Sequence, residues 1–156
     1  MSIRVLIADD QDLVRGALKV LLNLEPDIKV VAELGSGVGV ANAVKKYRVD
    51  VALLDIEMPG SELSSGIDVA AAIRDAKLVA LTGEPVRSLI LTTFGRPGYL
   101  RRALAAGASG FMVKDTSASQ LAEGIRRVHA GMHVVDPALA AESLAYGESP
   151  LTERET

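Results

Sequence analysis

The sequence contains no cysteine, few aromatic residues and no excess of positive charge. The absence of cysteine excludes a disulfide framework and a thiolate metal site, and it is compatible with a reducing cytosol. Aromatic residues make up only 3% of the chain, so its core must be aliphatic. The formal net charge of −3 provides nothing that would attract nucleic acid by charge alone.

Long apolar runs are also absent. No stretch approaches the roughly 20 residues that a membrane-spanning helix needs. The first apolar run is broken by Asp9 and Asp10 and is too short for the core of a signal peptide. We therefore expect a cytoplasmic protein that does not contact the membrane. Its 156 residues, of which 49% are hydrophobic, suit one globular domain with a short tail.

What the sequence does contain is an alternation of short aliphatic runs and amphipathic helical patterns. The aliphatic runs predict five strands, at residues 3–8, 28–34, 49–55, 88–93 and 110–113. Apolar residues at helical spacing predict five helices, at residues 13–22, 40–47, 67–76, 97–104 and 117–128. Gly107 and Gly131 fit the ends of the last two helices, and Ser117 with Gln120 fits a capping box.

The predicted strands are continuously apolar rather than alternating, which indicates that both faces of the sheet are covered. Repeated strand–helix units joined by right-handed crossovers give an α/β fold, a doubly wound five-stranded parallel sheet with five flanking helices. Residues 74–87 fit this pattern badly, because they contain a second apolar patch and a turn-like stretch at 83–85. They either extend the third helix or add a small strand.

Polar residues follow four of the predicted strands. Asp9 and Asp10 come after the first strand, and Asp55 ends the third. Thr92 lies at the end of the fourth strand, and Lys114 follows the fifth. The carboxyl ends of parallel strands share one edge of the sheet, so we expect all of these side chains at the edge where open α/β sheets bind ligands.

This set of side chains predicts phosphoryl chemistry. Three carboxylates at close quarters repel one another, and a hard divalent cation such as Mg²⁺ would relieve the repulsion. A lysine and a hydroxyl beside the metal would cradle a phosphoryl group, and a carboxylate can itself be the nucleophile that forms an aspartyl phosphate. Asp55 is the best candidate, because the turn at residues 58–60 would hold it at the sheet edge.

Together these residues resemble the receiver domain of bacterial response regulators of the NarL/FixJ class. The resemblance rests on the pair Asp9-Asp10, the DIEMPG run that starts at Asp55, Thr92 in LILTTF and Lys114 in GASGFMVKD. The runs DIEMPG and LTTFGRPGY are similar in particular to those of DesR-type regulators. The resemblance covers residues 3–131 and implies a flavodoxin- or CheY-like fold with strand order 2-1-3-4-5.

For the site, the resemblance implies that a sensor histidine kinase phosphorylates Asp55 in the presence of Mg²⁺. Asp9, Asp10, Asp55 and the backbone carbonyl of Glu57 would bind the metal, with Asp9 acting partly through water. The domain would not be an enzyme beyond self-catalysed phosphoryl transfer to Asp55 and slow loss of the group.

The resemblance also implies a conformational switch. Thr92 and Lys114 would contact the phosphoryl oxygens, and phosphorylation would draw Thr92 inward. Phe111, the switch aromatic three residues before Lys114, would move into the space left behind. The surface made by the fourth helix, fifth strand and fifth helix would change, which implies a homodimer on phosphorylation.

The tail has a different character from the rest of the chain. A short helical pattern follows Asp136-Pro137, and LTERE at 151–155 looks like the opening of a helix-turn-helix domain. We therefore expect a receiver domain at 1–134, a linker with a short helix at 135–150, and the start of a truncated LuxR-type domain at 151–156. DNA would be bound only through that missing C-terminal domain.

Two features depart from the family pattern. The interval from Asp55 to Thr92 is longer by roughly two to three helical turns of sequence, with extra residues at 61–66 and 75–87. Thr93 also follows Thr92, although the spacing to Lys114 favours Thr92.

Each site residue alone has a simpler explanation. Asp9 and Asp10 could cap the first helix, Asp55 could be a solvated acid, and Lys114 could form a surface ion pair. Two other functions also stay open, a receiver-like scaffold that takes no phosphate and a Mg²⁺-dependent phosphohydrolase. Phosphatases of the haloacid-dehalogenase type need an acid–base Asp two residues after the nucleophile, where this chain has Glu57.

Two further patterns have a stronger structural interpretation. The run GSGVGV at 35–40 lacks the third glycine of a dinucleotide-binding motif, so we interpret it as a turn and helix cap. The basic pairs at 101–102 and 126–127 are more simply solvated helix faces than a dimer or kinase surface.

Overall fold

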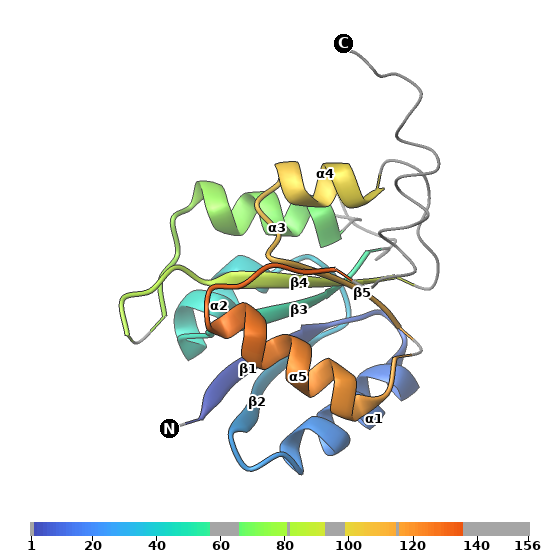
Figure 1. Cartoon of the computed structure of the whole chain (residues 1–156). Coiled ribbons are helices and arrows are strands. Elements are labelled where there is room, and N and C mark those ends of the chain that lie inside the picture. Colours follow the sequence, from blue (N-terminus) through green and yellow to red (C-terminus); the bar gives the residue numbers. More distant parts are fainter. Residues whose placement is uncertain (1, 57–65, 81, 93–98, 115, 136–156) are drawn as a thin grey trace.

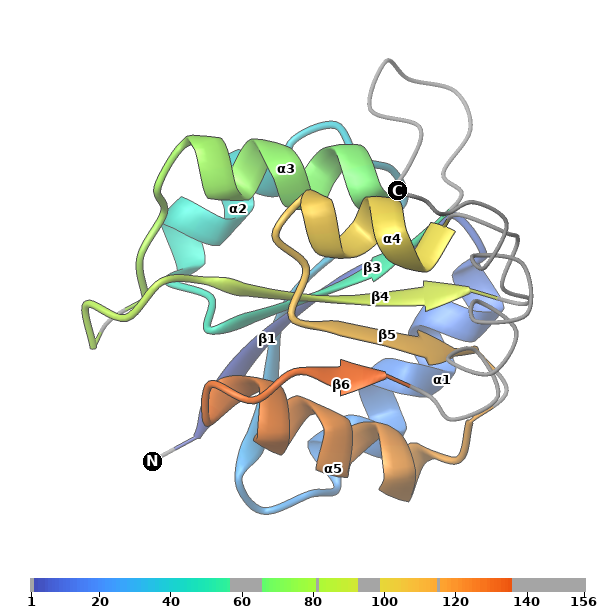
Figure 2. The ribbon, with the colours of Figure 1, turned by 45° about the horizontal axis from the view of Figure 1, so that its top comes forward.

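The computed structural model describes residues 2–56, 66–80, 82–92, 99–114 and 116–135. Within them, six parallel strands form one sheet in the order β2-β1-β3-β4-β5-β6 (Figures 1 and 2). The strands are β1 Ile3–Ala8, β2 Ile28–Leu34, β3 Val51–Asp55, β4 Arg87–Thr92, β5 Gly110–Val113 and β6 Val134–Val135. The predicted doubly wound fold and the order 2-1-3-4-5 are confirmed.

Helices cover both faces of the sheet. They are α1 Asp12–Asn23, α2 Val40–Tyr47, α3 Gly66–Asp75, α4 Tyr99–Ala105 and α5 Ala118–His129. Helices α1 and α5 lie on one face, and α2, α3 and α4 lie on the other (Figure 2). Each face has its own aliphatic core cluster, the first containing Leu22 and Ile125 and the second containing Val44 and Ile73. Burial on both sides explains why the strands are continuously apolar.

The predicted count of five strands is wrong by one. After α5 the chain returns along the open edge of β5, where Val134 pairs with Gly110 and Val135 pairs with Phe111. The Val134 N–H also donates to the Ser109 carbonyl at 2.9 Å. Strand β6 spans only two residues, too short a run to show strand periodicity in the sequence. The sheet therefore extends one residue past the predicted end of the receiver domain at 134.

The segment between α3 and β4 is neither a longer helix nor a regular strand. Helix α3 ends at Asp75, and Lys77 adopts a left-handed backbone with φ of 53°. Val79 then forms an isolated antiparallel bridge with Pro85, around a turn in which Gly83 has φ of 86°. This small bridged turn resolves the two alternatives that the sequence left open for residues 74–87.

The helix ends test the predicted caps. Gln11, not Asp9 or Asp10, is the N-cap of α1, and the Gln11 side chain makes no capping hydrogen bond. Asp9 Oδ1 accepts the Gln11 N–H at 2.8 Å just ahead of the helix, but neither Asp9 nor Asp10 occupies the capping position. At α5, the Ser117 side chain accepts a hydrogen bond from the Gln120 N–H at 3.2 Å, which is one half of the predicted capping box.

Candidate functional site

Three carboxylates meet at the carboxyl-terminal edge of the sheet. Asp9 and Asp10 follow β1, and Asp55 is the last residue of β3. One oxygen from each of the three lies within 4.8 Å of the others. Asp10 is exposed, whereas Asp9 and Asp55 are only 2% and 6% exposed. The neighbouring strands β1 and β3 end at the same level, with Ala8 paired to Leu54, and this register brings the acids together.

Lys114 supplies a positive charge to this cluster from the end of β5. Its Nζ lies 3.1 Å from Asp9 Oδ2 and 3.2 Å from Asp55 Oδ2, and it donates to Gln11 Oε1 at 3.1 Å. Burial by itself lowers the pKa of Lys114, but the hydrogen bond to Asp9 and the charges of Asp55 and Asp9 outweigh it. The net effect raises the pKa of Lys114, so this side chain stays charged and offsets the carboxylate repulsion.

Thr92 lies at the same edge, as the last residue of β4, and is 1% exposed. Its backbone carbonyl accepts a hydrogen bond from the Lys114 N–H at 2.7 Å. The strand that carries Thr92 is thus joined directly to the residue that neutralises the acids. Of the other predicted site positions, Glu57 lies outside the described residues, as does Thr93.

Phe111 lies inside the domain. It is 1% exposed, pairs with Ile90 of β4 and with Val135 of β6, and belongs to the core cluster on the α3 and α4 side. Its place between the site strand and the last strand suits a switch residue, a role that stays a prediction.

Gly66, which was not predicted from the sequence as a site residue, holds the backbone of Asp55. Gly66 begins α3, and its N–H donates to the Ile56 carbonyl at 3.0 Å. A Cβ atom built on Gly66 would lie 2.5 Å from the Asp55 carbonyl oxygen, closer than real Cβ contacts occur. Only glycine therefore allows α3 to start against Asp55. A glycine that opens a predicted helix was the available signal, and it is weak without the fold.

The chemistry of the donor set fits a hard divalent cation. Asp9, Asp10 and Asp55 each offer a carboxylate oxygen, and these oxygens lie within 4.8 Å of one another. Mg²⁺ prefers oxygen ligands of this kind. Lys114 offsets only one of the three formal negative charges, so the cluster keeps a net negative charge. Such a site can attract a cation and present a carboxylate as a nucleophile.

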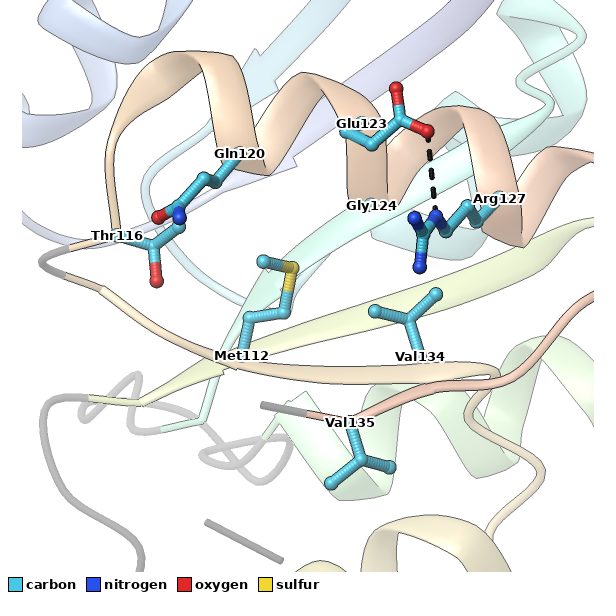
Figure 3. Close-up of a pocket in the computed structure, with 8 residues that line it drawn as sticks. All are labelled: Met112, Thr116, Gln120, Glu123, Gly124, Arg127, Val134 and Val135. Carbon is cyan, nitrogen blue, oxygen red and sulfur yellow. Dashed lines mark hydrogen bonds and ion pairs between the residues drawn. The ribbon is translucent and has the colours of Figure 1, made fainter. Parts of the chain in front are cut away.

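A separate cavity of about 300 Å³ lies between α5 and the β5–β6 edge (Figure 3). On its α5 side, Arg127 forms an ion pair with Glu123, four residues earlier on the same helix, at 3.4 Å (Figure 3). The lining residues are Met112, Thr116, Gln120, Glu123, Gly124, Arg127, Val134 and Val135. The list contains none of the predicted site residues, so this cavity is not the place of the predicted chemistry.

The run at 35–40 does not form a dinucleotide site. Gly39, with φ of 84°, is the N-cap of α2, and Val40 is fully buried in the core as its first residue. A side chain fills the position where the third glycine of such a motif would have to be empty.

Comparison with known proteins decides the family. Residues 5–126 match the response regulator receiver domain. The chain belongs to the response regulator receiver-domain family. It is 42% identical over 153 residues to the transcriptional regulatory protein DesR of Bacillus subtilis. The aligned residues cover 98% of this chain and 71% of DesR.

Solved receiver domains have the same fold. The signal receiver domain of the response regulator designated NarL from Mycobacterium tuberculosis superposes with a TM-score of 0.74 at 32% identity, covering 83% of this chain and 98% of that one. The response regulator ChrA of a heme-sensing two-component system superposes with a TM-score of 0.73 at 31% identity, covering 97% and 69%. Within the described part of this receiver domain, no helix combines the length and apolar character needed to cross a bilayer.

Proposed function

We propose that Asp55 is the phosphoacceptor of this receiver domain, and that a sensor histidine kinase phosphorylates it in the presence of Mg²⁺. The observation that carries the proposal is the group of three converging carboxylates with Lys114 bound to two of them. Asp55 is the nucleophile, because it ends a central strand and the peptide group between Asp55 and Ile56 is held in place. Strand β4 holds the N–H of this peptide, and α3 packs against its carbonyl. The Ile56 N–H donates to the Leu91 carbonyl at 2.8 Å, and Gly66 packs on the Asp55 carbonyl.

The transfer is a displacement at phosphorus. A carboxylate oxygen of Asp55 forms the new P–O bond while the P–N bond to the kinase histidine breaks, and the leaving imidazole takes up a proton. Bound Mg²⁺ would neutralise charge on the phosphoryl oxygens. Asp9, Asp10, Asp55 and the Glu57 backbone carbonyl are the residues that would hold it.

Lys114 and Thr92 are the residues that would contact the phosphoryl oxygens. Lys114 Nζ already lies 3.2 Å from an Asp55 oxygen, so the oxygens of a phosphoryl group on Asp55 come within its reach. Thr92 stands at the end of the adjacent strand and bonds through its backbone to Lys114. A cation and a hydroxyl there stabilise the transferred charge.

Phosphorylation would then control an output beyond this domain. We infer that Thr92 and Phe111 shift together and favour a homodimer, which changes the activity of an attached DNA-binding domain. The support is the pairing of Phe111 with Ile90 two residues before Thr92, together with the transcriptional role in the name of DesR. Apart from Val135, the predicted linker at 135–150 lies outside the described residues, as does the predicted helix-turn-helix start at 151–156.

Intact-mass spectrometry after incubation with acetyl phosphate and Mg²⁺ tests the phosphoacceptor. We expect one added phosphoryl group, which EDTA prevents and Asp55→Asn abolishes. The matched control is Asp50→Asn, because Asp50 is also buried but lies before the other end of β3. That variant should be phosphorylated like the wild type.

The other outcomes separate the two alternative functions. A folded wild-type chain that takes no phosphoryl group would favour the scaffold. Many turnovers of small phosphomonoesters per site would favour the phosphohydrolase. Sedimentation velocity with and without acetyl phosphate then tests the homodimer, and we expect a shift to the dimer that Asp55→Asn lacks.

A further inference from the structure

One arginine ties the loop that carries the acidic pair to two other parts of the domain. Arg15 lies in α1, and its Nη1 donates a hydrogen bond to the backbone carbonyl of Asp9 at 2.6 Å. Its Nη2 lies 2.7 Å from Asp12 Oδ1, and its Nε lies 3.2 Å from Glu33 Oε1 on β2. The Arg15 side chain is only 17% exposed. The guanidinium therefore joins the acidic loop, the first turn of α1 and strand β2.

The carbonyl of Asp9 lies where the sheet no longer provides donors. The last pairs of β1 are Ala8 with Leu34 and Ala8 with Leu54, and the Asp9 N–H still donates to the Leu34 carbonyl at 3.0 Å. Beyond that point the chain leaves the ladder and turns into α1. A buried backbone carbonyl in such a turn needs a donor from elsewhere, and Arg15 supplies it.

The orientation of this peptide decides where the two carboxylates lie. Asp9 Oδ1 accepts the Gln11 N–H at 2.8 Å, and Asp9 Oδ2 lies 3.1 Å from Lys114 Nζ. Asp10 is attached to the same carbonyl that Arg15 holds. A rotation of that peptide would change where both carboxylates lie relative to Asp55.

We propose that Arg15 is a positioning residue for the cation site. It does not contact the cation. It holds the carbonyl between Asp9 and Asp10 so that both carboxylates converge on Asp55. The planar guanidinium can do this because it makes three hydrogen bonds in fixed directions, which an ammonium group cannot. The proposal rests on the proposed function, since it concerns the Mg²⁺ that this site would hold.

The chain offers a matched control one turn further along α1. Lys19 Nζ lies 2.8 Å from Glu33 Oε2, so Lys19 and Arg15 share the same acidic partner. Among the described residues, Lys19 forms its ion pair with Glu33 and not with Asp9. Removal of either residue takes one positive charge from the same helix, but only removal of Arg15 releases the Asp9 carbonyl.

The experiment is calorimetric titration of Mg²⁺ into the unphosphorylated chain, with thermal unfolding followed in parallel. We expect Arg15→Ala to weaken Mg²⁺ binding about tenfold, as loss of an outer partner of a metal site typically does. Lys19→Ala should stay within about twofold of the wild type, because its distant charge is screened by solvent. Arg15→Lys should recover part of the loss, since lysine restores one donor but not the fork.

Each result points one way. Equal Mg²⁺ affinity in the wild type and in folded Arg15→Ala would overturn this inference alone, as would an equal loss in Arg15→Ala and Lys19→Ala. A wild-type chain that binds no Mg²⁺ would overturn the proposed function and this inference together. If Arg15→Ala does not fold, Arg15→Lys decides, because the inference requires it to bind Mg²⁺ more weakly than Lys19→Ala does.

Discussion

The two edges of the sheet use charged side chains in different ways. At the amino-terminal edge, charged groups bond to backbone atoms or form ion pairs that solvent reaches, such as Arg126 with Asp27, whose side chains are 31% and 41% exposed. Asp50 Oδ2 accepts the Arg4 N–H at 2.8 Å, and Arg74 Nη1 donates to the Ala105 carbonyl at the end of α4 at 2.6 Å. At the carboxyl-terminal edge, Asp9 and Asp55 instead face Lys114 in ion pairs that are largely buried, with side chains only 3%, 7% and 11% exposed.

This difference separates structural charge from functional charge. A charge bonded to backbone atoms satisfies groups that the fold has left without partners. Buried charges that face one another are little screened by solvent, so a cation or a phosphoryl group can change their repulsion and attraction. The carboxyl-terminal edge should therefore respond to Mg²⁺, and the amino-terminal edge should not.

The largest expected effect is at Lys114. Lys114→Met leaves Asp9 and Asp55 buried without their cation, so the free energy of unfolding should fall by about 3 kcal/mol in the absence of divalent ions. Mg²⁺ should recover much of this loss, because it replaces the missing positive charge. Urea unfolding with and without Mg²⁺ measures both effects.

Arg87→Met is the control from the other edge. Arg87 lies 3.5 Å from the exposed Glu84, so its loss should cost less than about 1 kcal/mol and should not depend on Mg²⁺. Equal losses in the two variants, with equal Mg²⁺ responses, would remove the distinction between the edges.

The next effect concerns the backbone of Asp55. Gly66→Ala places a Cβ against the Asp55 carbonyl oxygen, which should cost about 1–3 kcal/mol of stability and slow phosphorylation by acetyl phosphate. Gly16→Ala is the control, because Gly16 lies inside α1 with nothing within 4 Å of its Cβ position. It should stabilise the domain by up to about 1 kcal/mol. Normal phosphorylation of Gly66→Ala would show that α3 can move without disturbing the site.

A smaller effect is expected at the amino-terminal edge. Asp50→Ala removes the acceptor for the Arg4 N–H and should cost about 1 kcal/mol, since a partly buried donor loses its partner. The loss should be the same with and without Mg²⁺ in urea unfolding. A Mg²⁺-dependent loss would contradict the assignment of a purely structural role to this carboxylate.

The smallest effect is in the pH dependence of stability. The hydrogen bond from Lys19 lowers the pKa of Glu33 despite partial burial, and Arg15 adds to the shift. A lowered carboxyl pKa contributes stability above the ordinary value near 4.5, and this contribution is lost as pH falls through the pKa of the folded state. The raised pKa of Lys114 contributes stability below about 10.5, which is lost as pH rises through its folded-state pKa.

Two variants separate the loss of stability at acid pH from the loss at alkaline pH. Glu33→Gln should weaken the loss of stability at acid pH and leave the loss at alkaline pH unchanged, whereas Lys114→Met should weaken the loss at alkaline pH. Urea midpoints measured across the pH range give both. If Glu33→Gln loses stability at acid pH just as the wild type does, the ion pairs of Glu33 with Arg15 and Lys19 contribute nothing measurable to stability.

Much of the fold could be predicted from local sequence. The strands predicted at 3–8, 28–34 and 110–113 agree with the structure residue for residue, because each is a short aliphatic run between turn residues. The predicted third strand began two residues early, at 49 instead of Val51. The Asp50 side chain bonds to the Arg4 N–H ahead of that strand, and periodicity does not reveal such a contact.

The site was predictable for a topological reason. In a parallel sheet every strand ends at the same edge, so residues that follow different strands meet whatever their separation in sequence. For this reason Lys114 Nζ donates a hydrogen bond to Gln11 Oε1, although the two residues are 103 positions apart in the sequence. Gln11, Gly66 and Arg15 were not predicted as site partners, because their importance depends on which atoms lie next to Asp9, Asp55 and Lys114.

The sequence by itself determined the alternating elements, the parallel sheet and the edge where the acids, Thr92 and Lys114 gather. These follow from hydrophobic period and chain direction, which are local properties. Only the tertiary structure decided the pairing of β6 with β5 and the bridged turn before β4. It also decided the close approach of Gly66 to Asp55 and the hydrogen bond from Arg15 to the Asp9 carbonyl. These depend on distances of a few ångströms between distant segments, which packing sets and periodicity does not encode.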